Sequence, residues 1–300
     1  MSAHGEGLVI AAHRRHARVH LDDGYDIDCV QKGRRLGLAS GDRVRVSIGG
    51  SEGVVETLLP RRSLFLRADA VREQPIAANV TQVVGVVAPD IAVDEYLLNR
   101  WIVAAEAQAC RFVLVANKRD LPTFVALRTR LAFYESLGYP VVDVAARASV
   151  APLTELLAGQ HSVLIGQSGM GKSTIINALV PDAPARVGDV SVALGSGRHT
   201  TTVSTLYRLP LLDDGWIVDS PGVKAFGIAQ IEPDRLAEAF VEMRPFLGHC
   251  RFRDCGHRHE PDCAVLTAAA EGSVTAQRLA LYHTLVDEAQ RARAGVYGAT

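Results

Sequence analysis

A glycine-rich octapeptide is the strongest chemical signal in the sequence. Residues 166–173 read GQSGMGKS, which matches G-x-x-x-x-G-K-[ST] between an apolar run at 162–165 and a helical pattern after Ser173. In such a loop, successive backbone N–H groups and the N-terminus of the next helix face a chain of phosphates. Lys172 is expected to reach the β- and γ-phosphates, and the Ser173 hydroxyl to bind Mg²⁺. The motif therefore predicts a nucleoside triphosphate site.

A second motif, NKRD at 117–120, follows the apolar run 112–116 and predicts recognition of guanine. The Asp120 carboxylate can accept from guanine N1–H and the 2-amino group, and adenine has neither donor. A site built around this acceptor rejects the wrong base because its polar group would be left unpaired. Asn117 can bridge the base edge and the phosphate loop, and the segment 144–146 can offer a backbone N–H to guanine O6.

The sequence DSPG at 219–222 follows the apolar run 216–218 and predicts the Mg²⁺ end of the same site. A carboxylate at the end of a strand is the second Mg²⁺ anchor of phosphate-loop sites, so this role falls to Asp219. The N–H of Gly222 can meet the γ-phosphate. The D-x-P-G pattern alone is only a turn, and it gains weight from the phosphate loop upstream.

The segment 197–202, GRHTTT, lies where a nucleotide-sensing loop belongs. A threonine there, such as Thr201, can bind Mg²⁺ only when the γ-phosphate is present, which orders the loop. Val223 stands where some GTPases place a glutamine that orients water, so hydrolysis by the chain alone is expected to be slow. His199 is the candidate for positioning the water, although a histidine in a polar loop is also typical of plain surface.

The order of these motifs along the chain is unusual. Guanine-recognition residues precede the phosphate loop, whereas the ordinary GTPase order is the reverse. The same site can be built either way if the old termini are joined and the chain is opened elsewhere. The sequence therefore predicts a circularly permuted GTPase.

Three of the five cysteines cluster near the C-terminus in the spacing C-x4-C-x-H-x5-C. Three thiolates and one imidazole suit a closed, tetrahedral structural Zn²⁺ site. The predicted ligands are Cys250, Cys255, His257 and Cys263, with His249 and His259 left as alternatives. Cys29 and Cys110 stand alone in apolar surroundings and are expected to be buried thiols.

The composition is that of an ordinary globular protein. Hydrophobic residues make up 48% of the 300 and charged residues 22%, which argues against a disordered, collagen-like or coiled-coil chain. No apolar run approaches the ~18–20 residues of a membrane span, and the N-terminus lacks a signal-peptide pattern. A cytoplasmic protein without a membrane partner is expected. The formal net charge of −1 gives no overall attraction to nucleic acid.

The elements that must position these motifs divide the chain into three parts. Residues 1–70 contain five short β-type runs broken by turns, which predict a small closed barrel of the OB-fold-like or SH3-like kind. Residues 71–230 alternate short apolar runs with helical patterns, which predict an α/β sheet of buried parallel strands. Asp94 is expected to cap the helix that follows it. Residues 231–300 predict a zinc-binding helical domain, with helices over 232–243 and 276–294.

The motif set resembles the family of ribosome small subunit-dependent GTPase A, also called RsgA or YjeQ. The resemblance covers nearly the whole chain and includes the permuted order, the zinc spacing and the sequence EPDCAV at 260–265. It implies a GTPase that acts on the small (30S) ribosomal subunit and its 16S rRNA late in assembly. Hydrolysis would be stimulated by that subunit and coupled to release of assembly factors. His199 matches the histidine proposed to assist catalysis in that family, and Thr81 departs from a common aspartate outside the nucleotide motifs.

The residues also leave two other functions open. In one, GTP locks an RNA- or ribosome-binding shape and turnover is incidental. In the other, the site serves an ATPase or kinase, against which Asp120 argues. The chain is expected to be a monomer, with GTP or GDP, Mg²⁺ and one structural Zn²⁺ as cofactors. The predicted nucleotide-binding residues are Asn117, Lys118, Asp120, Ile165, Gly166, Gln167, Ser168, Gly169, Met170, Gly171, Lys172, Ser173, Thr174, Thr201, Asp219 and Gly222.

Overall fold

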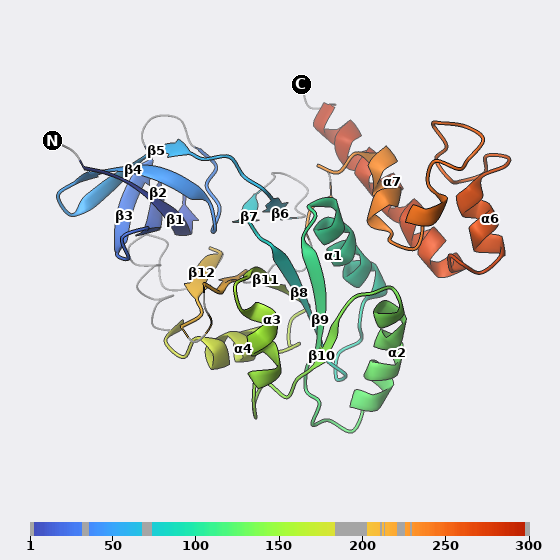
Figure 1. The fold of residues 1–300 in the computed structure, drawn as a ribbon, viewed down its shortest axis with the longest axis horizontal. Helices are drawn as coiled ribbons and strands as arrows, with labels where there is room; N and C mark the ends of the chain where they lie inside the picture. Colours follow the sequence, from blue (N-terminus) through green and yellow to red (C-terminus); the bar gives the residue numbers. More distant parts are fainter. Residues whose placement is uncertain are drawn as a thin grey trace.

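Three parts follow one another along the chain in Figure 1: a β-barrel, a mixed α/β unit and a helical C-terminal unit. The computed structural model describes residues 3–31, 36–67, 74–183, 203–210, 212, 214–220, 226–228 and 230–297. Among the helices within these ranges, none is both long and apolar enough to cross a membrane.

The N-terminal strands close into a barrel with the order β1-β2-β3-β5-β4. All neighbouring pairs are antiparallel except β3 with β5. In β2 every second residue is buried, so that Ala17, Val19 and Leu21 fill the interior while polar residues face outward. The predicted OB-like barrel is confirmed. Its strands are β1 (Ala3–His13), β2 (His16–Leu21), β3 (Asp26–Gln31), β4 (Arg43–Gly49) and β5 (Glu52–Leu58).

The central sheet has the order β10-β9-β8-β11-β13-β12. Five of its strands are parallel, and each coincides with one of the apolar runs in the sequence. Burial is complete in β8 and interrupted only at the first residue of β9 and β11, which fits central strands covered on both faces. The strands are β8 (Gln82–Val87), β9 (Arg111–Ala116), β10 (Val141–Asp143), β11 (His161–Ile165) and β13 (Trp216–Asp219). The antiparallel edge strand β12 (Thr205–Arg208) was not predicted, because four residues carry too little pattern.

The first helix of the central unit begins where the sequence indicated. The Asp94 carboxylate accepts a hydrogen bond from Leu97 N at 3.1 Å and so caps the first helix, as predicted. The helices are α1 (Glu95–Ala107), α2 (Phe124–Ser136), α3 (Thr154–Leu157, after the 3₁₀ turn η1, Ala151–Leu153) and α4 (Lys172–Leu179).

A two-stranded sheet joins the barrel to the central unit. Strands β6 (Leu64–Leu66) and β7 (Pro75–Ala78) pair on either side of the predicted boundary at residue 70, and Phe65 packs in the core of the central sheet. The domain boundaries at residues 70 and 230 stay a prediction.

The helix expected over residues 232–243 forms 3₁₀ turns instead. The apolar residues Leu236, Phe240 and Met243 recur at the α-helical intervals of four and three, but Phe240 and Met243 lie beyond the end of the 3₁₀ helix η2. They pack together with Val103 of α1 and Leu285 of the last helix in a second core. The elements of this part are η2 (Pro233–Ala239), η3 (Arg244–Phe246), α6 (Ala264–Ala270) and α7 (Ala276–Tyr297).

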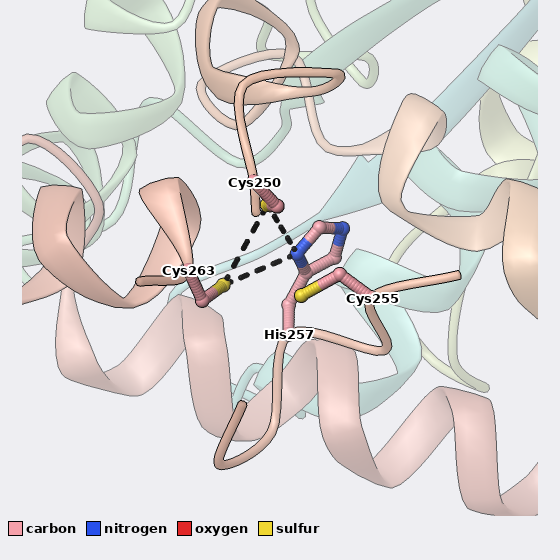
Figure 2. A group of neighbouring side chains, drawn as sticks. All are labelled: Cys250, Cys255, His257 and Cys263. Atoms are coloured by element: carbon pink, nitrogen blue, oxygen red, sulfur yellow. Dashed lines mark hydrogen bonds between the residues drawn. The ribbon is translucent and has the colours of Figure 1, made fainter. Parts of the chain in front are cut away.

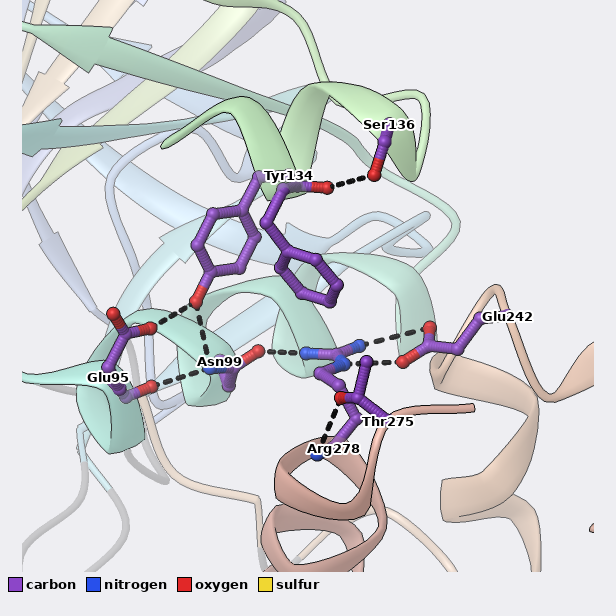
Figure 3. A network of polar contacts seen from close by, with 8 residues as sticks. Glu95, Asn99, Tyr134, Ser136, Glu242, Thr275 and Arg278 are labelled. Atoms are coloured by element: carbon purple, nitrogen blue, oxygen red, sulfur yellow. Dashed lines mark hydrogen bonds and ion pairs between the residues drawn. The ribbon is translucent and has the colours of Figure 1, made fainter. Parts of the chain in front are cut away.

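The buried Arg278 side chain connects the C-terminal unit to the central one (Figure 3). Arg278 of α7 is 2% exposed and pairs with Glu242, while its guanidinium stacks over Phe240 at 4.6 Å. The same guanidinium donates to Asn99 Oδ1 of α1, and Asn99 Nδ2 donates to the Tyr134 hydroxyl at 3.1 Å. Polar groups from α1, α2, α7 and the 3₁₀ region thus satisfy one another in the interior.

Arg100 of α1 makes a second connection between the parts. It is buried, donates through Nε to the backbone oxygen of Phe226 at 2.6 Å and pairs with Glu288 of α7. The Phe226 ring lies 4.6 Å from that of Phe65 in β6. Phe226 is therefore held between β6 and α1.

Replacing Arg278 with methionine should strongly destabilise the protein, because Glu242 would be left buried without its partner. We expect Arg278→Met to lower the free energy of unfolding by about 3–5 kcal/mol in urea denaturation followed by tryptophan fluorescence. Arg235→Met is the matched control, since Arg235 pairs with Glu238 on the exposed surface and should contribute less than about 1 kcal/mol. Equal losses in the two variants would contradict the assigned role of the buried pair.

Candidate nucleotide-binding and metal sites

The sequence motifs converge at the carboxyl ends of the parallel strands. The phosphate loop follows β11, the NKRD segment follows β9 and Asp219 ends β13. The chain runs outward from β8 to β10 and then returns to β11 on the other side of β8. In open α/β sheets ligands bind at such a reversal of strand order, outside the carboxyl ends.

The phosphate loop is shaped by close backbone approaches. Gly171 precedes α4 with a φ of +100°, and a Cβ there would lie 2.2 Å from Asn117 Nδ2. A Cβ on Gly166 would lie 2.5 Å from the backbone oxygen of Val86 in β8. Both positions therefore require glycine, and the loop wraps closely over the ends of β8 and β9.

Lys172 and Asp219 are the charged groups at the base of this loop. Lys172 Nζ donates to the backbone oxygens of Gly166 at 2.6 Å and Gln167 at 3.0 Å. Burial lowers the pKa of Lys172, and the negative charge of Asp219 opposes that change. Burial likewise raises the pKa of Asp219, with Lys172 opposing it. The two groups are thus electrostatically coupled, and a phosphate and a divalent cation would compensate both.

Asn117 joins the phosphate loop to the end of β10. Its side chain is 2% exposed; Nδ2 donates to Met170 O at 3.0 Å, and Oδ1 accepts from Ala146 N at 3.1 Å. The bridge that the sequence suggested to the phosphate loop is therefore present. The loop containing Ala146 is the one expected to contact the base, so one side chain aligns both halves of the candidate site.

Lys118 makes a contact that the sequence analysis missed. Its Nζ pairs with Asp90 Oδ2 at 2.6 Å and donates to Gly169 O at 2.8 Å. The hydrogen bond from Lys118 lowers the pKa of Asp90. Asp90 lies shortly after β8, and its place beyond the end of a strand was the signal that could have identified it.

The remaining predicted residues differ in exposure. Asp120 is exposed beside the loop held by Asn117, which leaves its carboxylate available to a base. Gln167 accepts from Asp94 N at 3.3 Å, Ile165 and Met170 are buried, Thr174 is half-buried, and Ser168, Gly169 and Ser173 are exposed. His199, Thr201, Gly222 and Val223 lie outside the described residues.

The four predicted metal ligands point toward one another in Figure 2. Their ligand atoms all lie within 4.8 Å of each other. Cys250 Sγ is 3.8 Å from Cys263 Sγ, and His257 Nδ1 is 3.5 and 3.4 Å from these two sulfurs. Zn–S bonds of about 2.3 Å at tetrahedral angles place two sulfurs about 3.8 Å apart, so the donor set fits a tetrahedral ion.

The loop between the ligands is ordered by Glu260. Its carboxylate accepts from the backbone N–H groups of Gly256, Arg258 and His259 at 2.8 to 3.0 Å. His257 takes a φ of +55°, and its backbone oxygen is 2.7 Å from His283 Nε2 of α7. Glu260 was noted in the sequence only as part of a family resemblance.

The two alternative histidines are not part of the cluster. His249 Nδ1 faces the backbone oxygen of Pro245 at 3.2 Å, and among the described residues only the four predicted ligands meet in this group. Burial lowers the pKa of His257, which favours the neutral imidazole that a metal requires.

The comparisons with known proteins agree with this arrangement. A family model described as RsgA GTPase matches residues 58–229. The chain is 47% identical to small ribosomal subunit biogenesis GTPase RsgA of Nitrosomonas europaea, over 93% of this chain and 90% of that protein. The Bordetella pertussis protein of the same name is 44% identical, over 97% and 99% of the two chains.

Two solved structures share the fold. YjeQ from Thermotoga maritima superposes with a TM-score of 0.73 at 29% identity and covers 96% of this chain and 99% of its own. YloQ, described as a circularly permuted GTPase, gives a TM-score of 0.71 at 25% identity and covers 96% of both chains. The predicted fold class, with a barrel before a permuted GTPase sheet, is thereby confirmed.

The geometry of the cysteine cluster predicts a structural zinc ion. We expect one zinc per purified chain by elemental analysis and its loss in Cys263→Ser, because a thiolate ligand is removed. Cys110→Ser is the matched control, since Cys110 is also buried but donates to Val80 O at 3.1 Å, away from the cluster. Equal zinc contents in the two variants would contradict the assignment.

Proposed function

The chain belongs to the RsgA GTPase family, and from that premise we propose that it hydrolyses GTP during late maturation of the small (30S) ribosomal subunit. The observation that carries the proposal is the Asn117 side chain, which ties the guanine-recognition segment to the phosphate loop despite their reversed order in the sequence. Hydrolysis would be stimulated by the subunit and coupled to release of assembly factors.

In this proposal the site residues divide into four roles. Asp120 reads guanine, while the glycine-rich loop and Lys172 bind the β- and γ-phosphates. Ser173, Thr201 and Asp219 hold Mg²⁺, which would neutralise charge on the phosphates. Gly222 donates its N–H to the γ-phosphate, and His199 positions the attacking water. The coupled charges of Lys172 and Asp219 support the phosphate and Mg²⁺ assignments.

The zinc-binding part supports an additional role in docking on 16S rRNA. Phe252 is 42% exposed in the loop between the first two ligands, and the Arg251 guanidinium lies 5.4 Å from its ring centroid. Exposed aromatic and arginine side chains stack on unpaired bases, and arginines also contact phosphates. Local patches of this kind are needed because the net charge is −1.

We propose that the protein acts as a cytoplasmic monomer.

GTP hydrolysis with isolated ribosomal subunits tests this function directly. We expect slow turnover by the protein alone and a rise of about tenfold or more with small subunits, because docking would order the groups that position water. Large subunits should have no comparable effect, and Lys172→Ala should abolish the activity in both conditions. Equal stimulation by large and small subunits would contradict the proposed partner.

Base recognition makes a separate prediction. Asp120→Ala should weaken GTP binding by about 100-fold, because two hydrogen bonds to a charged acceptor are lost, without improving ATP binding. The measurement is titration with fluorescent nucleotides. Asp234→Ala removes an exposed carboxylate from the C-terminal part and serves as the control. An unchanged GTP affinity in Asp120→Ala would remove this residue from the site.

A further inference from the structure

The buried hydroxyl of Ser40, in the barrel, contacts the segment between the GRHTTT and DSPG motifs. Ser40 lies just before β4 and is 2% exposed, and its Oγ donates to the backbone oxygen of Ser204 at 2.7 Å. Ser204 in turn places its Oγ 3.2 Å from the Oγ of Ser220. Ser220 is also 2% exposed and is bonded directly to Asp219. A chain of three serines thus links the barrel to the candidate Mg²⁺ anchor.

The backbone around Ser40 is held firmly from both sides. Ala78 N of β7 donates to Ser40 O at 2.8 Å, and Gly41 N donates to Val9 O of β1 at 2.8 Å. A Cβ on Gly41 would lie 2.2 Å from the backbone oxygen of Ala78, so this approach requires glycine. The Ser40 hydroxyl is therefore presented from a rigid position between the barrel and β7.

A buried ion pair fixes the next turn of the same segment. The Asp42 carboxylate is fully buried, accepts from Ala39 N at 2.7 Å and receives two hydrogen bonds from Arg61, each of 2.7 Å. Bidentate arginine pairs of this kind restrict geometry as well as adding stability. The segment 39–42 consequently cannot relax easily if the Ser40 contact is lost.

The barrel contacts the edge of the sheet at several points. Ala11 of β1 packs against Val203, next to Ser204. Farther along, the His20 ring of the barrel lies 5.6 Å from the Trp216 ring of β13, beside a cavity of about 720 Å³ that Arg18 and Arg208 also line. Ser40 and Ala11 thus contact the two residues that directly precede β12.

We propose that Ser40 is a positioning residue for GTP hydrolysis, acting through Ser204 and Ser220 on Asp219. The proposal rests on the proposed function and deepens it by naming how the barrel controls the Mg²⁺ end of the site. Ser204 lies two residues after the GRHTTT segment, and Ser220 is the second residue of the DSPG motif, so Ser40 restrains a position close to each. A partner that moves the barrel relative to the sheet would change this restraint.

The test is the Mg²⁺ requirement of the full-length protein. We expect Ser40→Ala to raise the Mg²⁺ concentration for half-maximal GTP hydrolysis by about three- to tenfold, the effect of one lost hydrogen bond. GDP affinity measured without Mg²⁺ should stay at the wild-type value. Ser63→Ala is the matched control, because the Ser63 hydroxyl is equally buried and donates to Val80 O at 2.8 Å, away from Ser204. It should lose similar thermal stability without changing the Mg²⁺ requirement.

A second variant separates positioning from folding. Ser220→Ala leaves the barrel intact and should raise the Mg²⁺ requirement in the same direction, and the double variant should lose less than the sum of both effects. The inference is overturned if Ser40→Ala and Ser63→Ala have the same Mg²⁺ requirement, or if the two serine effects simply add. Absence of Mg²⁺-dependent GTP hydrolysis in the wild-type protein would instead overturn the proposed function, and this inference with it.

Discussion

The buried side-chain amide of Asn117 is the contact on which the candidate nucleotide site depends. An amide away from water must have both its donor and its acceptor satisfied, and here the partners are Met170 O and Ala146 N. One side chain therefore sets the spacing between the phosphate loop and the loop after β10. Gly171 follows from the same constraint, because any Cβ at that position would collide with the amide nitrogen.

The outer parts of the protein attach to this centre by buried polar contacts as well as apolar ones. Arg278 and Arg100 connect α7 with α1, and Arg100 also holds the backbone of Phe226. Ser40 connects the barrel with Ser204 on the opposite side. Isolated polar groups in the interior are costly, so such contacts favour one relative arrangement of the three parts. Arg100 contacts Phe226, four residues after the DSPG motif, and Ser40 reaches Ser220 of that motif through Ser204.

Circular permutation explains why these attachments lie there. Opening the chain elsewhere puts Asp219 and its strand near the end of the GTPase sheet, so the C-terminal unit begins shortly after them. The barrel, at the other end of the chain, rests against β12, the edge strand paired with β13. The barrel thus flanks the Mg²⁺ end of the site, whereas the C-terminal unit packs on α1 and reaches Tyr134 of α2.

The sequence by itself determined the features that depend on local pattern. Continuous apolar runs predicted the five parallel strands, Asp94 predicted a helix cap, and the spacing of Cys250, Cys255, His257 and Cys263 predicted their meeting. These features depend on residues that are close together in the sequence, or on parallel strands whose carboxyl ends lie at one edge of the sheet.

Only the tertiary structure decided which distant groups meet. The hydrogen bond from Ser40 to Ser204 joins residues 164 positions apart, and the one from Arg278 to Asn99 joins residues 179 positions apart. Lys118, after β9, pairs with Asp90, after the neighbouring strand β8. The four residues of β12 and the 3₁₀ turns of η2 likewise acquire their form from the surfaces they cover. Pairings of this kind depend on strand order and on the packing of separate parts, and neither is encoded in the spacing of neighbouring residues.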